Sequence, residues 1–145
     1  MRYPIGIQDF QKLRELGYAY VDKTALVYKL ADSGNYYFLS RPRRFGKSLL
    51  LSTFEAYFSG RRDLFEGLAI ESLEHKWTKH PILHLDLNTE NYRERGSLER
   101  RLNNTLLLWE QTYGSFAGET SLALRFEGIV RRACEQAGER VVILV

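Results

Sequence analysis

The sequence has one cysteine, Cys134, and no apolar run of about 18 residues. A single cysteine excludes an internal disulfide and suits a reducing compartment. A membrane-spanning helix needs an apolar run of about that length, so we expect no membrane span and no membrane partner. The first ten residues, MRYPIGIQDF, lack the charged and then apolar layout of a signal peptide. These absences together indicate a cytoplasmic protein.

The composition is typical of a globular domain. Of the 145 residues, 44% are apolar and 13% are aromatic, which is enough to build a core and excludes a disordered chain. The length predicts one domain at most. The net charge of +3 permits a polyanionic partner without requiring one, and the basic excess is concentrated in a single turn.

That turn lies in the stretch from Tyr36 to Phe58, YYFLSRPRRFGKSLLLSTFEAYF. Tyr36 to Leu39 predicts a strand, and a helix opens at the tripeptide GKS. A strand, a phosphate-cradling turn and a helix make up a P-loop, whose signature is GxxxxGK[ST]. Arg41 stands where that signature has its first glycine, and Pro42 removes one amide donor. The stretch therefore predicts a variant Walker A nucleotide site.

The residue types of the turn suggest their roles. Unpaired N–H groups at a helix start attract phosphate. Lys47 would reach the terminal phosphates as the catalytic cation, and the Ser48 hydroxyl would hold a magnesium ion. No acidic residue occurs from Ser33 to Phe54. We therefore expect ATP and Mg²⁺ as cofactors. The expected nucleotide-binding residues are Ser40, Arg41, Pro42, Arg43, Arg44, Phe45, Gly46, Lys47, Ser48 and Leu49.

The three arginines of the turn leave two roles open. One of Arg41, Arg43 and Arg44 neutralises charge in the transition state, or each of them pairs with a carboxylate of the sheet. For the whole stretch, the plain alternative is a basic surface loop before an amphipathic helix.

Strands and helices alternate along the rest of the chain. Asp22 is predicted to cap a helix from about Lys23 to Ala31. Pro81 to Leu87 alternates apolar and polar residues, which predicts an edge strand. Helices are predicted to begin at Ser97, as an N-cap, and after Gly118. The apolar run from Val141 to Val145 predicts a strand buried on both faces.

This alternation predicts an α/β domain with a largely parallel sheet. Ligands bind at the carboxyl ends of the strands in such sheets. Asp86 lies near the end of the second predicted strand, so it is a candidate for the same crevice as the basic turn. The alternative for Asp86 is a solvated position on an edge strand.

Several strings of the sequence resemble a known family, the bacterial AAA-ATPase-like proteins, a P-loop group often found with a downstream PD-(D/E)XK nuclease-like domain. The matching strings are YVDKT (Tyr20 to Thr24), FLSRPRRFGKSLL (Phe38 to Leu50), LFEGL (Leu64 to Leu68), HP (His80 and Pro81), and RF (Arg125 and Phe126) followed by VVILV (Val141 to Val145). RPRRFGKS is a highly specific string, so the resemblance makes Arg41 a family trait.

The resemblance implies a P-loop NTPase fold of the RecA/AAA type, an α/β three-layer sandwich with a mostly parallel sheet that is incomplete in this fragment. Residues 1–145 are then the N-terminal portion of a single AAA-ATPase-like domain. In similar proteins the run at Val145 continues into an Asp-Glu pair, the Walker B acids. We therefore expect Mg-dependent ATP hydrolysis in the full-length protein, and weak nucleotide binding with hardly any hydrolysis by this chain.

Other functions stay open. The cations of the turn, with Tyr36, Tyr37 and Phe45 nearby, suit a nucleic-acid-binding module. The resemblance also allows a nuclease-associated regulatory module, which reaches nucleic acid through the downstream nuclease-like domain. A third alternative is an interaction scaffold that keeps nucleotide without hydrolysing it. An open sheet edge makes an oligomer possible.

Overall fold

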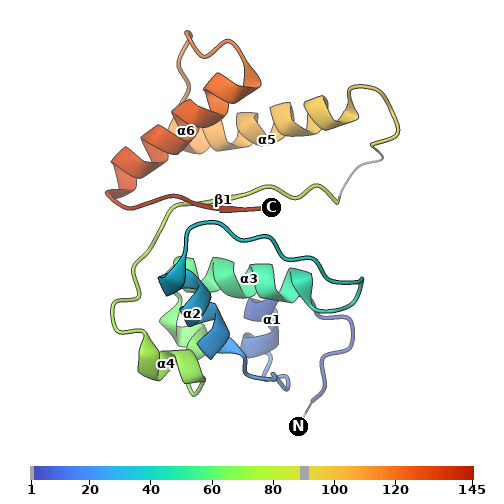
Figure 1. Cartoon of the computed structure of the whole chain (residues 1–145), viewed down its shortest axis with the longest axis vertical. Helices are drawn as coiled ribbons and strands as arrows, with labels where there is room; N and C mark the ends of the chain where they lie inside the picture. The colour runs from blue at the N-terminus through green and yellow to red at the C-terminus, as the bar shows by residue number, and fades with distance from the viewer. Residues whose placement is uncertain (1, 89–91) are drawn as a thin grey trace. The chain divides into compact units, whose positions relative to one another are not determined.

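The computed structural model describes residues 2–88 and 92–145 (Figure 1). It consists of two compact units, Met1–Lys79 and His80–Val145. The first contains α1 (Phe10–Glu15), α2 (Thr24–Ser33), α3 (Lys47–Phe58), the 3-10 turn η1 (Arg62–Phe65) and α4 (Ala69–Leu73). The second contains β1 (Ile82–His84), α5 (Ser97–Tyr113), α6 (Leu122–Ala137) and β2 (Val142–Leu144). The described part is thus mixed α/β, and none of its helices has the length and apolar character to cross a membrane.

Aromatic side chains fill the core of the first unit. Phe10 of α1 and Phe65 of η1 are fully buried, with ring centroids 4.8 Å apart. Trp77 packs on Phe65 with centroids 5.3 Å apart, and Tyr57 of α3 meets both rings edge-on. Tilted and edge-on contacts are the arrangements that aromatic rings favour. This cluster fixes α3 against α1 and η1.

Asp22 and Thr24 join the starts of two helices. Asp22 Oδ1 accepts the N–H and the hydroxyl of Thr24, at 2.9 and 2.7 Å. The N-cap of α2 is Lys23, so the prediction of Asp22 as the N-cap is wrong by one residue, although its carboxylate accepts the first N–H of the helix. Its Oδ2 accepts the N–H of Ala69 at 2.7 Å, and the buried hydroxyl of Thr24 accepts the N–H of Ile70 at 3.1 Å. Burial raises the pKa of Asp22, but these hydrogen bonds outweigh it and hold the pKa below its usual value. The pair therefore ties α2 to α4.

The residues before α3 form no strand in the described part of the chain. Residues 36–40 belong to no element, and Tyr36 and Phe38 are 95% and 93% exposed. The prediction of a strand from Tyr36 to Leu39 is therefore wrong for this structure. The aromatic residues favour an extended backbone, but a strand also needs a neighbour to take its backbone hydrogen bonds. The two strands of the described part pair with each other.

The second unit is built on that parallel pair of strands. β1 pairs with β2 so that Leu83 lies opposite Ile143. Leu83 is fully buried and packs with Leu106 of α5 and Ile129 of α6. Parallel strands need a long crossover between them, and α5 and α6 supply it. The predicted parallel arrangement of these two strands is confirmed.

Burial agrees with the prediction along β1 and differs along β2. Leu83 is buried while His84 and Asp86 are exposed, as the alternation predicts. Ile143, however, is 45% exposed, so the prediction that residues 141–145 are buried on both faces is wrong. An apolar run shows what a strand is able to bury, whereas its actual burial depends on the elements that cover it.

The helix at residue 97 also begins differently from the prediction. Its N-cap is Gly96, with a left-handed φ of 78°, and not Ser97. The buried hydroxyl of Ser97 instead donates to the carbonyl oxygen of Glu94 at 2.9 Å. The hydroxyl of a serine next to a helix start can either accept an N–H of the first helical turn or donate to a carbonyl oxygen before the helix. Ser97 makes the second of these bonds.

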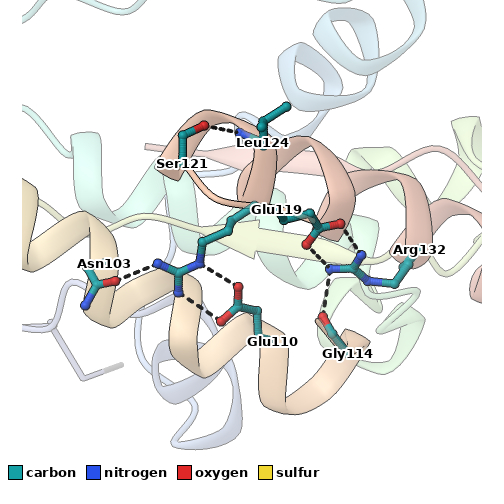
Figure 2. Close-up of polar contacts among 8 residues, drawn as sticks. Asn103, Glu110, Gly114, Glu119, Ser121, Leu124 and Arg132 are labelled. Carbon is teal, nitrogen blue, oxygen red and sulfur yellow. Dashed lines mark hydrogen bonds and ion pairs between the residues drawn. The ribbon is translucent and has the colours of Figure 1, made fainter. Parts of the chain in front are cut away.

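Two arginines of α6 hold its connection to α5. Arg125 donates two hydrogen bonds to the carboxylate of Glu110, at 2.7 and 2.9 Å. Figure 2 shows Arg132 beside the carboxylate of Glu119 and the carbonyl of Gly114. The hydrogen bonds from Arg132 lower the pKa of Glu119. Two-bond pairs of this kind fix both position and direction, so the loop between the helices is held against α6.

We expect Asp22→Asn to destabilise the first unit by about 1 kcal/mol at pH 7, because asparagine leaves one of the Thr24 and Ala69 amides without an acceptor. The native pKa of Asp22 lies below the unfolded value of about 3.9. The contribution of Asp22 is therefore complete above that pH and disappears as the pH falls through the native pKa. Urea unfolding followed by Trp77 fluorescence in a Trp109→Phe background reports on the first unit. Equal destabilisation at pH 7 and at about pH 2.5 would contradict this account.

A Cβ atom at Gly128 would lie 1.8 Å from Oε1 of Glu119. We expect Gly128→Ala to destabilise the second unit, because Glu119 must then leave Arg132. In a Glu119→Ala background the same substitution is expected to stabilise the unit by about 1 kcal/mol, the helix preference of alanine over glycine. Urea unfolding followed by Trp109 fluorescence in a Trp77→Phe background measures both. The same sign in the two backgrounds would show that the close approach is unimportant.

Candidate functional site

The turn at residues 40–46 leads directly into α3. The helix begins at Lys47, and its N-cap, Gly46, has a left-handed backbone (φ 77°) and no side-chain cap. Helical bonding starts where Leu50 donates to the carbonyl of Gly46, at 2.9 Å. The N–H groups of Lys47, Ser48 and Leu49 come before that bond and have no acceptor within the helix. They lie at the positive end of the helix dipole, which favours an anion.

The backbone before α3 alternates in the sign of φ. Arg44 has a φ of 66° and Gly46 a φ of 77°, while Phe45 between them is not among the residues with positive φ. Where right-handed and left-handed helical residues alternate, successive N–H groups face the same side and form a concave anion-binding surface. For a residue with a Cβ atom, the left-handed conformation costs about 1–2 kcal/mol. The turn thus holds Arg44 in a conformation that its side chain disfavours.

Lys47 folds back over the turn. Its Nζ donates a hydrogen bond to the carbonyl oxygen of Arg41 at 2.9 Å. This bond closes the turn and keeps the ammonium group beside the backbone that precedes α3. Arg41, in the position of the first glycine of the signature, does not have a positive φ. The turn therefore brings Lys47 and Arg41 together through a backbone oxygen.

The arginine side chains of the turn face solvent. Arg41, Arg43 and Arg44 are all exposed, and within residues 2–88 and 92–145 none of them makes an ion pair. The alternative in which each arginine pairs with a carboxylate of the sheet stays a prediction, because β1 and β2 belong to the second unit. Positive charge without a nearby carboxylate suits a polyanionic ligand.

The metal-binding side of the prediction has less support. Ser48 is exposed, and the described residues contain no group of three His, Cys, Asp or Glu side chains that could hold a metal ion. Asp86 belongs to the second unit, where its exposed carboxylate accepts the N–H of Asn88 at 2.9 Å. Its place beside the turn stays a prediction. Taken alone, the turn fits phosphate better than a bare metal ion.

The sequence patterns did not predict the role of Ser52. This serine of α3 accepts the N–H of Phe10 at 2.9 Å, and its hydroxyl lies 3.4 Å from the carbonyl oxygen of Gln8. It therefore holds the segment before α1 beside α3. In the sequence, Ser52 is a polar residue among the apolar residues of the helix pattern. That does not identify a contact with another segment, because a serine in a helix commonly donates to a carbonyl of its own helix. Ser52 does this as well, donating to the carbonyl of Leu49 at 2.9 Å.

Comparisons with known proteins concern almost the whole chain. The sequence model of a family described as "Predicted AAA-ATPase" matches residues 4–145. A protein of Azotobacter chroococcum mcd 1, described as "Uncharacterized protein in vnfD 5'region", is 41% identical over 145 residues. This match covers 99% of the chain but 28% of the relative, so the chain spans less than a third of that protein. No solved structure matches the chain.

The left-handed backbone of Arg44 gives a prediction about stability. We expect Arg44→Gly to stabilise the first unit by about 0.5–1 kcal/mol, because glycine adopts a positive φ without a clash. Arg43→Gly removes the same charge at a position without positive φ, and is expected to destabilise the unit by about 0.5–1 kcal/mol through chain entropy. Urea unfolding followed by Trp77 fluorescence compares them. The opposite order would mean that the turn does not keep this backbone in solution.

Proposed function

The chain belongs to the predicted AAA-ATPase family, and we propose that it binds ATP at residues 40–49, with the phosphates at the first turn of α3. The observation that carries the proposal is one exposed turn that combines unpaired amides, a backbone of alternating φ and the ammonium group of Lys47. No acidic residue lies between residues 33 and 54. A triphosphate would supply negative charge to this turn, whose arginines make no ion pair within residues 2–88 and 92–145.

Each residue of the turn has a separate task in this proposal. Lys47 exchanges the carbonyl of Arg41 for a phosphate oxygen, which replaces a neutral acceptor with a charged and stronger one. The amides of Ser48 and Leu49 donate to the phosphates. The Ser48 hydroxyl would hold Mg²⁺, which bridges and neutralises phosphate oxygens when bound. Arg43 and Arg44, both exposed, attract the ligand and add positive charge around it.

ATP hydrolysis is proposed for the longer protein. Phosphoryl transfer needs a group that orients the attacking water as well as the cations that neutralise charge. The turn contains cations and a hydroxyl but no carboxylate. The chain covers 28% of its Azotobacter relative, and we propose that acidic residues outside this chain complete the reaction. This chain then binds ATP with little or no turnover.

The P-loop fold is also part of the proposal. The parallel pairing of β1 and β2 agrees with such a fold. That residues 1–145 form the N-terminal part of one P-loop domain stays a prediction. A nuclease-like domain and an oligomer are likewise proposals for the longer protein.

Single-stranded nucleic acid is a second candidate ligand of the same turn. The observation that favours it is the exposure of Tyr36, Phe38 and Phe45, at 95%, 93% and 69%, next to unpaired cations. Bases stack on exposed aromatic rings while cations hold the phosphates. Oligonucleotide binding that falls steeply with salt and is unaffected by ATP would favour this candidate. Competition by ATP would instead place both ligands on the ATP site.

We expect Lys47→Ala to weaken the binding of Mg·ATP roughly 30-fold or more, because it removes a charge-assisted contact to phosphate. Isothermal titration calorimetry on this chain measures the dissociation constant. Lys29→Ala is the matched control, since it removes another exposed lysine of the same unit, on α2, and should leave binding unchanged.

Two outcomes of this titration would contradict the proposal. A folded wild-type chain that binds no Mg·ATP would remove the ATP site. Binding that survives in Lys47→Ala, or that is lost equally in Lys29→Ala, would place the nucleotide away from the turn. Circular dichroism of each variant shows whether it is folded.

A further inference from the structure

Two hydroxyl groups of α3 converge on one backbone oxygen. The hydroxyl of Thr53 donates to the carbonyl oxygen of Leu49 at 2.7 Å, and that of Ser52 donates to the same oxygen at 2.9 Å. Ser52 has a single hydrogen to donate, and the carbonyl oxygen of Gln8 is farther away, at 3.4 Å. One hydroxyl of a helix commonly bonds its own backbone, whereas two such bonds here polarise the same peptide group.

Each of these hydroxyls also takes part in a hydrogen bond from outside the helix. The N–H of Phe10, at the start of α1, donates to Ser52 at 2.9 Å, and α1 packs against α3 (Figure 1). A further hydrogen bond joins the hydroxyls of Tyr20 and Thr53. Because Thr53 donates its one hydrogen to Leu49, its oxygen is the acceptor in the bond to Tyr20. Burial raises the pKa of Tyr20, so its hydroxyl keeps its proton at neutral pH.

The carbonyl of Leu49 is connected to the first turn of the helix. It belongs to the same peptide group as the N–H of Leu50, which donates to the carbonyl oxygen of Gly46 at 2.9 Å. That carbonyl shares its peptide group with the N–H of Lys47, the first of the amides that have no acceptor within the helix. Hydrogen bonds in series polarise one another, and more strongly where water is excluded. Thr53 is 1% exposed, so this series begins in such surroundings and ends at the Lys47 amide.

We propose that Ser52 and Thr53 are positioning residues of the phosphate site, which act on the Lys47 amide through this series of hydrogen bonds. A polarised N–H donates a stronger hydrogen bond to a phosphate oxygen. The inference rests on the proposed function, since it takes the phosphates at the first turn of α3 as its starting point. It adds that phosphate affinity depends on two hydroxyls that do not contact the ligand themselves.

The first test removes the buried hydroxyl. Thr53→Val keeps nearly the same side-chain shape, and we expect it to weaken the binding of Mg·ATP and of inorganic tripolyphosphate by the same factor, about fivefold. The factor is the same because both ligands place phosphate at the Lys47 amide. Thr53→Ser keeps the hydroxyl and is expected to bind both ligands as the wild-type chain does. Isothermal titration calorimetry measures each dissociation constant.

A matched control and a second variant accompany this test. Thr105 of α5 is also buried, and its hydroxyl also donates to the carbonyl four residues earlier, that of Arg101, at 2.9 Å. Thr105→Val therefore removes the same kind of bond in the second unit and should leave both affinities unchanged. Ser52→Ala removes the other hydroxyl at a half-buried position, and we expect it to weaken both ligands about threefold.

The outcomes separate this inference from the proposed function. If either variant, Thr53→Val or Ser52→Ala, is folded by circular dichroism and binds both ligands as tightly as the wild-type chain, the inference is overturned while the ATP site stands. Should Thr53→Val fail to fold, Ser52→Ala decides alone. An equal loss of affinity in Thr53→Ser would assign the effect to packing, and an equal loss in Thr105→Val would remove its link to α3, so either result overturns the inference. If the folded wild-type chain binds neither ligand, the proposed function fails, and the inference fails with it.

Discussion

The candidate site depends on the burial of the second half of α3. Thr53, Ala56 and Tyr57 are buried, whereas Lys47 and Ser48 at the beginning of the helix are exposed. A helix of 12 residues is marginal in isolation, so the packing of its later turns keeps the first turn helical. Because the N-cap has no side chain, an anion there would supply the acceptor that a capping residue supplies in other helices.

Hydrogen bonds link the buried end of α3 to the residue after α4, and α4 to the start of α2. The Tyr57 hydroxyl donates to the carboxylate of Glu74, which follows α4. Burial raises the pKa of Tyr57, and the hydrogen bond to Glu74 raises it further, so the hydroxyl stays a donor at neutral pH. α4 in turn is tied to α2 through Asp22. The exposed turn is therefore positioned by polar contacts that lie well away from it in the sequence.

The local parts of this arrangement were predictable from the sequence, and the long-range parts were not. The helix that begins at Lys47, and the bond from the Thr24 amide to Asp22, follow from residue types within a few positions of each other. Asp22 also accepts a hydrogen bond from Ala69, 47 residues away. No pattern of neighbouring residues predicts a contact between such distant positions. The same limit explains the wrong prediction at Tyr36 to Leu39, since strand formation depends on a partner elsewhere in the chain.

The geometry of the turn also shows that its backbone does not require glycine at position 41, where the P-loop signature has its first glycine. Glycine is required where φ is positive or where a side chain would collide. The positive φ values of this turn fall at Arg44 and Gly46, and not at Arg41. Lys47 contacts position 41 through the carbonyl oxygen, which every residue type has. A side chain at position 41 therefore costs the turn nothing, and an arginine there adds positive charge beside the proposed phosphate site.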